Sequence, residues 1–537
     1  MKCSAGLGFL TLMTGVLLSG AASSTALTGS VVDATGKPTA NAFVTSEDGA
    51  RKMAVSVLTD ASGHYRIADL LPGEYAVRAR KTGFGDSAAV TKVTANIGDS
   101  AIDLKLQPDD AVHLSTPGAA WLNALPASPM KAQFITQCTI CHDQGSPLAH
   151  VPRDAAGWAA IITQMRNLNE SYASLITADS GPMSQWLAEQ KYGTRLASFD
   201  PFAARANVAT TARITEYSLG DVNSWAHDVV IEPGTSTVWV GDYVKDVLTS
   251  VNARTGEQKS YPAPLHGTGM HSLSFDRDGN LWITMQMVAQ VARFNTKTGE
   301  WRMFSGFSAG SLNHSFALDS EGYVKKDRSG RLYVSTWGNN HTTLLDPTTG
   351  AIKEIKLSGN PTDKPYGISV DSKGLIWYTK YSENMLGFVA PATGKGREWA
   401  LPRPQSGPHR MHIDNDDNLW IPLSGYGTIL RYNTRDNTQK EYPLPDADTF
   451  PYSARYDSKS DRVWITGNGG NAIYVLNPKT EKFMTFRMPS ALSYGRMVSI
   501  DYSTGDVWTG LASYPNKLSL RNHSIVVRIH HALDLVR

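Results

Sequence analysis

One short stretch recurs seven times in the 537-residue chain and constrains its fold more than any other feature. Each copy ends in Asp or Glu, and the copies begin at His227, His271, His314, Tyr366, His409, Tyr452 and Arg496. These positions lie 43 or 44 residues apart, except for one interval of 52 residues that contains the additional loop YVKKDRSG. A turn and a strand with an aromatic residue follow each copy, as in LWITM and VWITG. A period near 43 with about four short strands per unit is typical of a β-propeller blade, so the pattern predicts seven blades within residues 205–535.

The last unit ends soon after SIVVRIHH, without the final strand that the other units carry. The stretch ARITEYSL lies before the first unit and is similar to that missing strand. We therefore predict that residues 212–218 complete the last blade and close the ring, because closure removes open strand edges. An open solenoid would instead need polar capping units, and none is visible.

Two units, PYGISVDSKGLIWYTK and MHSLSFDRDGNLWITM, closely match two sequence motifs, P-H-G-I followed by D-G-N-L-W-F-T-E. With these motifs the repeats resemble the streptogramin lyase family of seven-bladed propellers, and the resemblance covers roughly 320 residues. In that family a Glu at the end of the second motif helps to hold magnesium and the substrate. The matching residues here are Asp242, Met285, Thr336, Lys380, Leu423, Gly467 and Leu511, so only Asp242 is a carboxylate. We therefore do not carry the lyase activity over from the resemblance.

Residues 27–107 alternate apolar and polar residues in YRIADL and YAVRAR, with turn sequences such as DASG and LPGE between them. Period-two alternation is typical of half-buried strands, so a small antiparallel β-sandwich is expected. The pattern G-x-V-x-D, T-D-x-S-G-x-Y and L-P-G-x-Y resembles the carboxypeptidase regulatory-like domain. This resemblance implies an accessory module without catalytic residues.

Residues 1–26 have the form of a secretory signal peptide, with Lys2, an apolar run, and small residues near Ala22 and Ala26. A membrane anchor is the alternative, but the apolar run is short for a full span. We expect an exported, periplasmic protein without a membrane span. The formal charge of +2 and the lack of basic runs predict no nucleic-acid partner.

Residues 118–200 place apolar residues at helical spacings, as in SPMKAQFITQC and GWAAIITQM, and they contain the only cysteines that would survive export. Cys138-Thr-Ile-Cys141-His142 is the attachment pattern of one covalent haem c, with His142 as the proximal ligand of the iron. A structural zinc site needs a second pair of ligands at similar spacing, and the chain has none. A thioredoxin-like redox pair requires a strand–helix fold, which this helical segment lacks. A plain disulfide would leave His142 unexplained. The segment is therefore predicted to be a small all-α cytochrome c domain.

The sixth ligand of the haem iron has several candidates. Met165 lies in GWAAIITQM, which resembles small cytochrome c domains with a W-x-x-V-x-x-M helix after the attachment site. We favour Met165 on that resemblance, with Met183 as the second choice and His150 or an open position as further alternatives. Met165 could equally be a core residue on the face of Trp158.

Equivalent positions of propeller blades form a ring around the central channel, so the first residues of the seven copies should face it. Four of these residues, His227, His271, His314 and His409, are the candidate catalytic residues, and they could bind a small molecule or an additional metal ion. His409 or His412 could act as a general base. The alternative is that these histidines serve packing and hydrogen bonding, as most do in the lyase family.

The combined pattern predicts a multidomain, mainly β protein that acts as a periplasmic haem-c oxidoreductase. In this interpretation the propeller hub binds a small-molecule substrate, and the haem passes electrons to a soluble partner. The alternative is a lyase-like or ligand-binding propeller with an accessory cytochrome domain. The blades lack the tryptophan docking pattern of quinone-dependent alcohol dehydrogenases, so no pyrroloquinoline cofactor is predicted.

Overall fold

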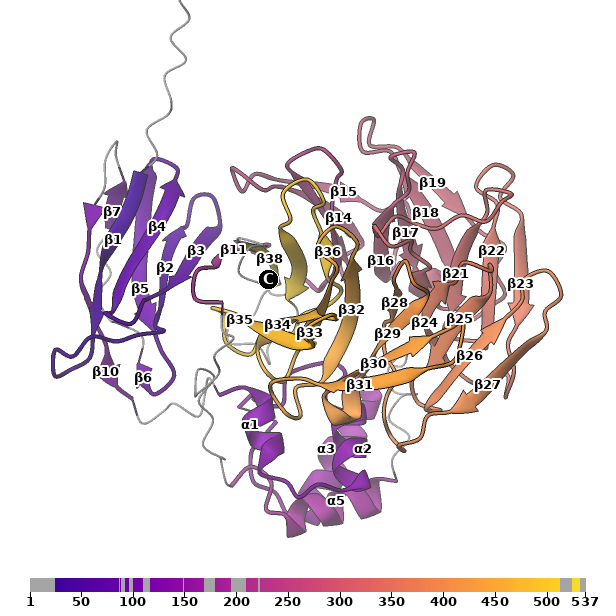
Figure 1. Ribbon diagram of the computed structural model, residues 1–537, viewed down its shortest axis with the longest axis horizontal. Helices are drawn as coiled ribbons and strands as arrows, with labels where there is room; N and C mark the ends of the chain where they lie inside the picture. The colour runs from indigo at the N-terminus through magenta and orange to yellow at the C-terminus, as the bar shows by residue number, and fades with distance from the viewer. Residues whose placement is uncertain are drawn as a thin grey trace, which may run out of the picture.

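The computed structural model describes residues 25–85, 87, 92–95, 100–109, 116–147, 149–168, 179–194, 209–220, 223–511 and 524–531. The protein is mainly β and has three parts, which Figure 1 shows as a small sandwich, a group of helices and a large ring of sheets. The expected signal segment lies outside the described residues except for Thr25 and Ala26, which begin the first strand. Within the described ranges, no helix is long and apolar enough to cross a membrane.

The N-terminal part is a β-sandwich, as the alternation of its sequence predicts. One sheet has the order β4-β1-β8 with β9 beside β1, and the other contains the run β3-β2-β5-β7. Apolar side chains of the two sheets, such as Leu27, Val44, Ile67 and Val77, are almost fully buried between them. The strands are β1 (Thr25–Val32), β2 (Phe43–Asp48), β3 (Met53–Leu58), β4 (His64–Leu70), β5 (Gly73–Arg80), β6 (Phe84–Gly85), β7 (Lys92–Ala95), β8 (Ser100–Ala101), β9 (Leu104–Lys105) and β10 (Gln107–Pro108).

The ring is a β-propeller of four-stranded antiparallel sheets, in which each repeat of the sequence forms a blade and its recurring stretch forms the first strand. The first three blades are β12 (Ala226–Ile231), β13 (Thr237–Asp242), β14 (Val247–Asn252), β15 (Gln258–Pro262); β16 (Met270–Phe275), β17 (Leu281–Met285), β18 (Gln290–Phe294), β19 (Trp301–Phe304); and β20 (Asn313–Phe316), β21 (Leu332–Thr336), β22 (His341–Leu345), β23 (Ile352–Lys356). The next three are β24 (Pro365–Val370), β25 (Ile376–Lys380), β26 (Met385–Val389), β27 (Gly396–Ala400); β28 (His412–Ile413), β29 (Asn418–Leu423), β30 (Thr428–Asn433), β31 (Gln439–Pro443); and β32 (Pro451–Asp457), β33 (Arg462–Gly467), β34 (Ala472–Asn477), β35 (Lys482–Arg487).

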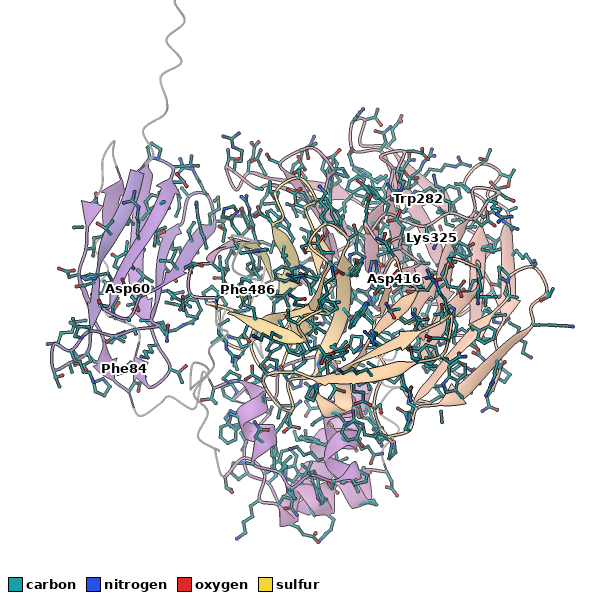
Figure 2. The ribbon with its side chains drawn as sticks, in the orientation of Figure 1. Asp60, Phe84, Trp282, Lys325, Asp416 and Phe486 are labelled. Atoms are coloured by element: carbon teal, nitrogen blue, oxygen red, sulfur yellow. The ribbon has the colours of Figure 1, made fainter. Side chains whose placement is uncertain are left out.

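The acidic residue that ends three of the recurring stretches has the same structural role in each. Its carboxylate accepts a hydrogen bond from the indole N–H of the tryptophan six residues later, at 2.8 or 2.9 Å, in the pairs Asp276–Trp282, Asp371–Trp377 and Asp414–Trp420. The indole rings are buried; Trp282, which is labelled in Figure 2, packs with Phe304 and with residues of the next blade. The acid–tryptophan spacing of these three repeats therefore encodes the turn and the packing between blades.

The seventh blade is closed by a strand from the other end of the propeller sequence. Strands β36 (Ser499–Ile500), β37 (Val507–Leu511) and β38 (Ile525–His530) are followed in the sheet by β11 (Arg213–Ser218). Strand β11 pairs antiparallel with β38 along its whole length, from Arg213 opposite His530 to Ser218 opposite Ile525. This confirms the prediction that residues 212–218 complete the last blade.

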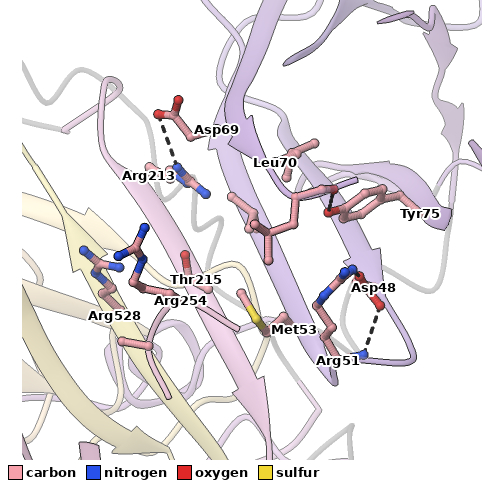
Figure 3. Close-up of a pocket in the computed structure, with 13 residues that line it drawn as sticks. Asp48, Arg51, Met53, Asp69, Leu70, Tyr75, Arg213, Thr215, Arg254 and Arg528 are labelled. Carbon is pink, nitrogen blue, oxygen red and sulfur yellow. Dashed lines mark hydrogen bonds and ion pairs between the residues drawn. The ribbon is translucent and has the colours of Figure 1, made fainter. Parts of the chain in front are cut away.

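The same β11 strand joins the propeller to the sandwich. Its other edge pairs with β3, with Ile214 opposite Ser56 and Tyr217 opposite Met53, so one eight-stranded sheet runs through both parts. Beside this junction lies a cavity of about 240 Å³, where Arg213 faces Asp69 at 3.8 Å (Figure 3). The continuous sheet leaves neither edge of β11 unpaired.

The middle of the chain is helical, as its spacing predicts. The described part contains α1 (Gly118–Asn123), α2 (Pro129–Cys138), α3 (Ala155–Leu168) and α5 (Ser180–Glu189). Helix α2 begins with a favourable cap, because the Ser128 hydroxyl accepts from Lys131 N at 3.1 Å and Pro129 needs no partner for its nitrogen. The helices lie together against one face of the propeller (Figure 1), with Trp121, Phe134 and Leu187 in a shared core with propeller residues.

Candidate functional site

The seven predicted hub residues form a ring around the channel. Successive ring centroids lie 3.8 Å apart for His227–His271, 3.9 Å for His271–His314, 4.2 Å for His314–Tyr366, 4.5 Å for Tyr366–His409 and 4.4 Å for His409–Tyr452. The guanidinium of Arg496 completes the ring at 5.5 Å from the Tyr452 ring centroid. All seven side chains are fully buried. The structure therefore brings together every hub position that the repeats predicted.

The hydrogen bonds of the histidines determine which ring nitrogen carries the proton. The Nδ1 atom of His227 lies 2.9 Å from the carbonyl oxygen of His271, and Nδ1 of His271 lies 2.9 Å from that of His314. Because a carbonyl oxygen only accepts, these Nδ1 atoms donate. His409 Nδ1 donates to Ser424 Oγ at 3.0 Å, since that hydroxyl itself donates to the Pro451 carbonyl.

The Nε2 atoms of His227, His271, His314 and His409 are buried and have no hydrogen-bond partner within the described ranges. In the Nδ1–H tautomer, Nε2 has a free lone pair and can only accept. Burial lowers the pKa of all four histidines, to about 4 for His227 and well below the usual value for the others. The hub at neutral pH therefore presents uncharged hydrogen-bond acceptors.

A buried ion pair lies below the ring. Arg410, which follows His409, donates to Asp228 Oδ1 at 2.7 Å, and both side chains are almost completely buried. Burial opposes ionisation of Asp228, but the attraction of Arg410 outweighs it and lowers the pKa of Asp228. Arg410 also donates to Ser272 and Ser315 at 3.2 Å. Neither residue of this pair was predicted from the sequence as part of the site, although both directly follow a ring histidine.

The hub has no clear arrangement for a metal. Among the described residues, no three or more His, Cys, Asp or Glu side chains are placed to hold an ion. Asp242, the single carboxylate at the lyase-like positions, accepts from Ser224 Oγ at 2.7 Å and from three backbone N–H groups. Lys380, at an equivalent position, is paired with Asp363 and Glu398 at 2.8 Å. A metal ion at the hub stays a prediction that the described geometry does not support.

Two other histidines of the propeller, His266 and His412, lie outside the hub. The side chain of His266 is fully exposed. His412 is buried on β28, where its Nδ1 accepts from Tyr456 N at 3.2 Å. Of the two candidates for a general base, only His409 belongs to the ring.

The turn with the two cysteines lies against the mouth of the channel. The Tyr381 hydroxyl donates to the carbonyl oxygen of Thr136 at 2.5 Å, and the Tyr494 hydroxyl donates to that of Thr139 at 2.7 Å. The rings of these tyrosines also contact the hub: Tyr381 lies 4.7 Å from His409, and the Arg496 guanidinium lies 4.5 Å from Tyr494. Lys131 pairs with Asp448 at 2.6 Å and fixes the same helix to the propeller. One layer of aromatic side chains therefore separates the cysteine turn from the ring.

Cys138 ends α2, and Cys141 and His142 follow in the turn. The two thiols are free, and burial raises the pKa of Cys138 to about 12 and that of Cys141 to about 11. His142 is buried, and its Nδ1 lies 3.2 Å from the carbonyl oxygen of Asp143. Thiols of such high pKa are poor nucleophiles on their own, so the pair does not have the character of a redox-active thiol site.

The two methionine candidates lie in different surroundings. Met183, on α5, is buried in the core cluster against which Cys138 and Cys141 pack. Met165, on α3, is half-exposed and is not a member of that cluster. His150 stacks on Trp121 with ring centroids 3.9 Å apart. The surroundings therefore favour Met183 over Met165, the reverse of the order that the sequence suggested.

The core around the cysteine turn contains buried hydrogen-bond donors that a haem could satisfy. The indole N–H groups of Trp121 and Trp158 and the hydroxyl of Tyr192 are buried without a hydrogen-bond partner among the described residues. All three belong to the core cluster that the cysteines contact. Buried donors need acceptors, and the carboxylates of a porphyrin are acceptors of the required kind.

Comparisons with known proteins agree with the fold of two parts of the chain. The profile of the virginiamycin B lyase family matches residues 318–509, and that of the carboxypeptidase regulatory-like domain matches residues 26–107. The chain therefore contains a virginiamycin B lyase-like domain and a carboxypeptidase regulatory-like domain. Neither profile includes the cysteine turn, and no curated protein matches the chain.

Solved structures of virginiamycin B lyase from Staphylococcus aureus are similar to the propeller. The selenomethionine-substituted enzyme has a TM-score of 0.50 and 18% identity, and covers 60% of this chain and 100% of its own. A catalytically inactive variant with quinupristin has a TM-score of 0.51 at the same identity and coverage. A streptogramin B lyase structure has a TM-score of 0.50, 18% identity, and 59% and 98% coverage. At this identity the likeness establishes the propeller fold alone.

Proposed function

We propose that this protein is a periplasmic c-type haem oxidoreductase whose propeller hub binds a small molecule beside the haem. The observation that carries the proposal is the position of the cysteine turn, which Tyr381 and Tyr494 hold directly over the histidine ring. A cysteine motif that only stabilised the helical segment would not have to lie beside the histidine ring. The same proposal includes three further expectations. The protein is exported, it passes electrons to a soluble partner, and it has no nucleic-acid partner.

The residues have defined roles in this proposal. Cys138 and Cys141 would hold the haem through thioether bonds, His142 would be the proximal ligand of the iron, and Met183 is the favoured sixth ligand, ahead of Met165. The haem would supply one-electron oxidation and reduction. Trp158 and Tyr192, which have no hydrogen-bond partner among the described residues, would donate hydrogen bonds to its carboxylates.

The hub's part is to bind and orient the substrate. The Nε2 atoms of His227, His271 and His409, which have no partner among the described residues, accept hydrogen bonds, so the ligand should carry hydroxyl or N–H groups. Because burial lowers the pKa of these imidazoles, they stay uncharged at neutral pH, and their part is to accept hydrogen bonds from the substrate.

The haem is tested first. The full chain is produced in cells that mature c-type cytochromes, and a pyridine haemochrome assay measures the covalently bound haem. We expect one haem per chain in the wild type and none in the Cys138→Ser, Cys141→Ser double variant. A correctly folded wild-type chain without covalent haem would end the proposal.

A lyase-like activity at the same hub is the second candidate. The comparisons support it more directly than the first, because they match the propeller and not the cysteine turn. His409 is the base it would use, but the described hub offers Asp228 as its buried carboxylate, and Arg410 already binds that group. Cleavage of quinupristin by wild type, retained in the double cysteine variant and lost in His409→Ala, would favour this function.

A further inference from the structure

The far end of the propeller channel contains a buried arginine with an incomplete set of partners. Arg455 lies toward the end of β32, whereas Tyr452, near the start of that strand, belongs to the hub ring; the two therefore face opposite ends of the channel. The side chain of Arg455 is 4% exposed. Its one hydrogen bond within the described ranges runs from Nη2 to the carbonyl oxygen of Gly322 at 3.4 Å, and its Nε is buried without a partner.

No carboxylate of the described residues forms an ion pair with Arg455. The acidic groups that affect its charge are Asp228 and Asp319, and each is already bound to another arginine: Asp228 to Arg410 at 2.7 Å, and Asp319 to Arg277 at 2.7 Å. A buried guanidinium without a counter-charge costs several kcal/mol, so such a group is usually paired. The missing partner of Arg455 is therefore an anion.

The guanidinium opens onto a cavity of about 250 Å³. Part of its wall is apolar, with Val230, Ile231, Phe275 and Ile500, and these side chains come from the ends of the innermost strands and their neighbours. The acidic residues of the wall are already bound: Glu321 pairs with Arg277 at 2.9 Å, and Asp501 accepts from Ser503 at 2.6 Å. Neither neutralises Arg455.

The backbone beside the guanidinium is adapted to this arrangement. Gly322 has φ +82°, and a Cβ atom at this position would lie about 2.1 Å from Arg455 Nη2. Glycine therefore allows the guanidinium to approach the backbone this closely, beside the cavity that Arg455 lines.

We propose that this cavity binds a small carboxylate with an apolar body, whose carboxylate pairs with Arg455. A guanidinium presents N–H donors in a planar fork that fits a carboxylate. The small volume excludes large ligands, and the apolar wall favours an organic anion over an inorganic one. This site is separate from the hub and does not depend on the haem.

Benzoate is the probe, titrated into the full chain by calorimetry at constant ionic strength. We expect benzoate to bind with a dissociation constant below about 1 mM and to raise the melting temperature, whereas uncharged benzamide does neither. Arg455→Met should weaken benzoate binding at least tenfold. Arg397→Met removes an exposed arginine of β27 and should leave binding unchanged.

Three outcomes would overturn the proposal: no benzoate binding at about 10 mM, equal binding by Arg455→Met, or sulfate binding that benzoate does not compete for. If Arg455→Met fails to fold, Arg455→Lys takes its place. Arg455→Lys keeps the positive charge but loses the planar pair of N–H donors that a guanidinium offers to a carboxylate. It should therefore bind benzoate several-fold more weakly than wild type.

Discussion

The hydroxyl of Tyr494 donates a 2.7 Å hydrogen bond to the carbonyl oxygen of Thr139, the residue directly after Cys138. The same tyrosine ring lies 4.5 Å from the guanidinium of Arg496, a member of the hub ring. One side chain of the propeller therefore contacts both the cysteine turn and the hub. Tyr494 is therefore the side chain to change in a test of how the propeller positions the turn.

Replacement of Tyr494 by Phe should loosen the cysteine turn. The variant leaves the buried Thr139 carbonyl without its partner, at a cost of about 1–3 kcal/mol. We expect faster hydrogen exchange in residues 136–142 than in wild type, measured by mass spectrometry.

Tyr432→Phe is the matched control for Tyr494→Phe. Its hydroxyl donates a bond of the same length, 2.7 Å, to Asn437 within one blade. This variant should cost less stability, because the exposed Asn437 can bond to water instead, and it should leave exchange in the cysteine turn unchanged. Equal exchange in the two variants would show that Tyr494 does not hold the turn.

The proposed haem allows a test that distinguishes Met183 from Met165 as its sixth iron ligand. Replacement of a thioether ligand lowers the reduction potential of a c-type haem. We therefore expect Met183→Leu to lower the midpoint potential and to change the absorbance spectrum, because Met183 lies in the cluster of the cysteines. Met165→Leu changes a half-exposed side chain and should leave both unchanged. The opposite result would restore the assignment made from the sequence.

The propeller could be predicted from the sequence because its signal is periodic. Each repeat places a channel residue, an acidic residue and an aromatic strand in the same order at nearly the same spacing, so seven weak signals support one another. The closing strand at residues 213–218 could be predicted for the same reason, since one blade lacked a piece that another segment could supply.

The aromatic layer under the cysteine turn could not be predicted in this way. Tyr381 follows the second strand of its blade and Tyr494 precedes the first strand of another, in connections that the repeat pattern leaves free. Their partners lie more than 200 residues away in the helical segment. Contacts of this kind depend on how two parts dock, and local propensity contains no information about that.

The stability of the propeller should fall as the pH is lowered below about 6.5. Burial lowers the pKa of the hub histidines in the folded chain, whereas unfolding restores the ordinary value of about 6.5. Between the two values the unfolded chain binds more protons, so each such histidine removes up to about 1.4 kcal/mol of stability per pH unit on acidification. Urea unfolding at pH 7.5, 6.5 and 5.5 measures this slope.

Two phenylalanine variants test the origin of that slope. His271→Phe removes one buried imidazole and should make the loss of stability with falling pH less steep. His266→Phe changes a fully exposed side chain and should leave the slope as in wild type. Identical slopes in the two variants would assign the pH dependence to other groups.

Removal of the N-terminal sandwich should make the protein self-associate. Strand β3 covers one edge of β11, and without residues 27–107 that edge would present unpaired backbone groups. We expect the shortened chain to form concentration-dependent oligomers in sedimentation velocity, while the full chain does not. Adding Thr215→Lys places a charge on the exposed β11 strand and should restore the monomer, because lysine on an edge strand disfavours pairing with another chain. A shortened chain that stays monomeric without Thr215→Lys would show that the sandwich is not needed to protect this edge.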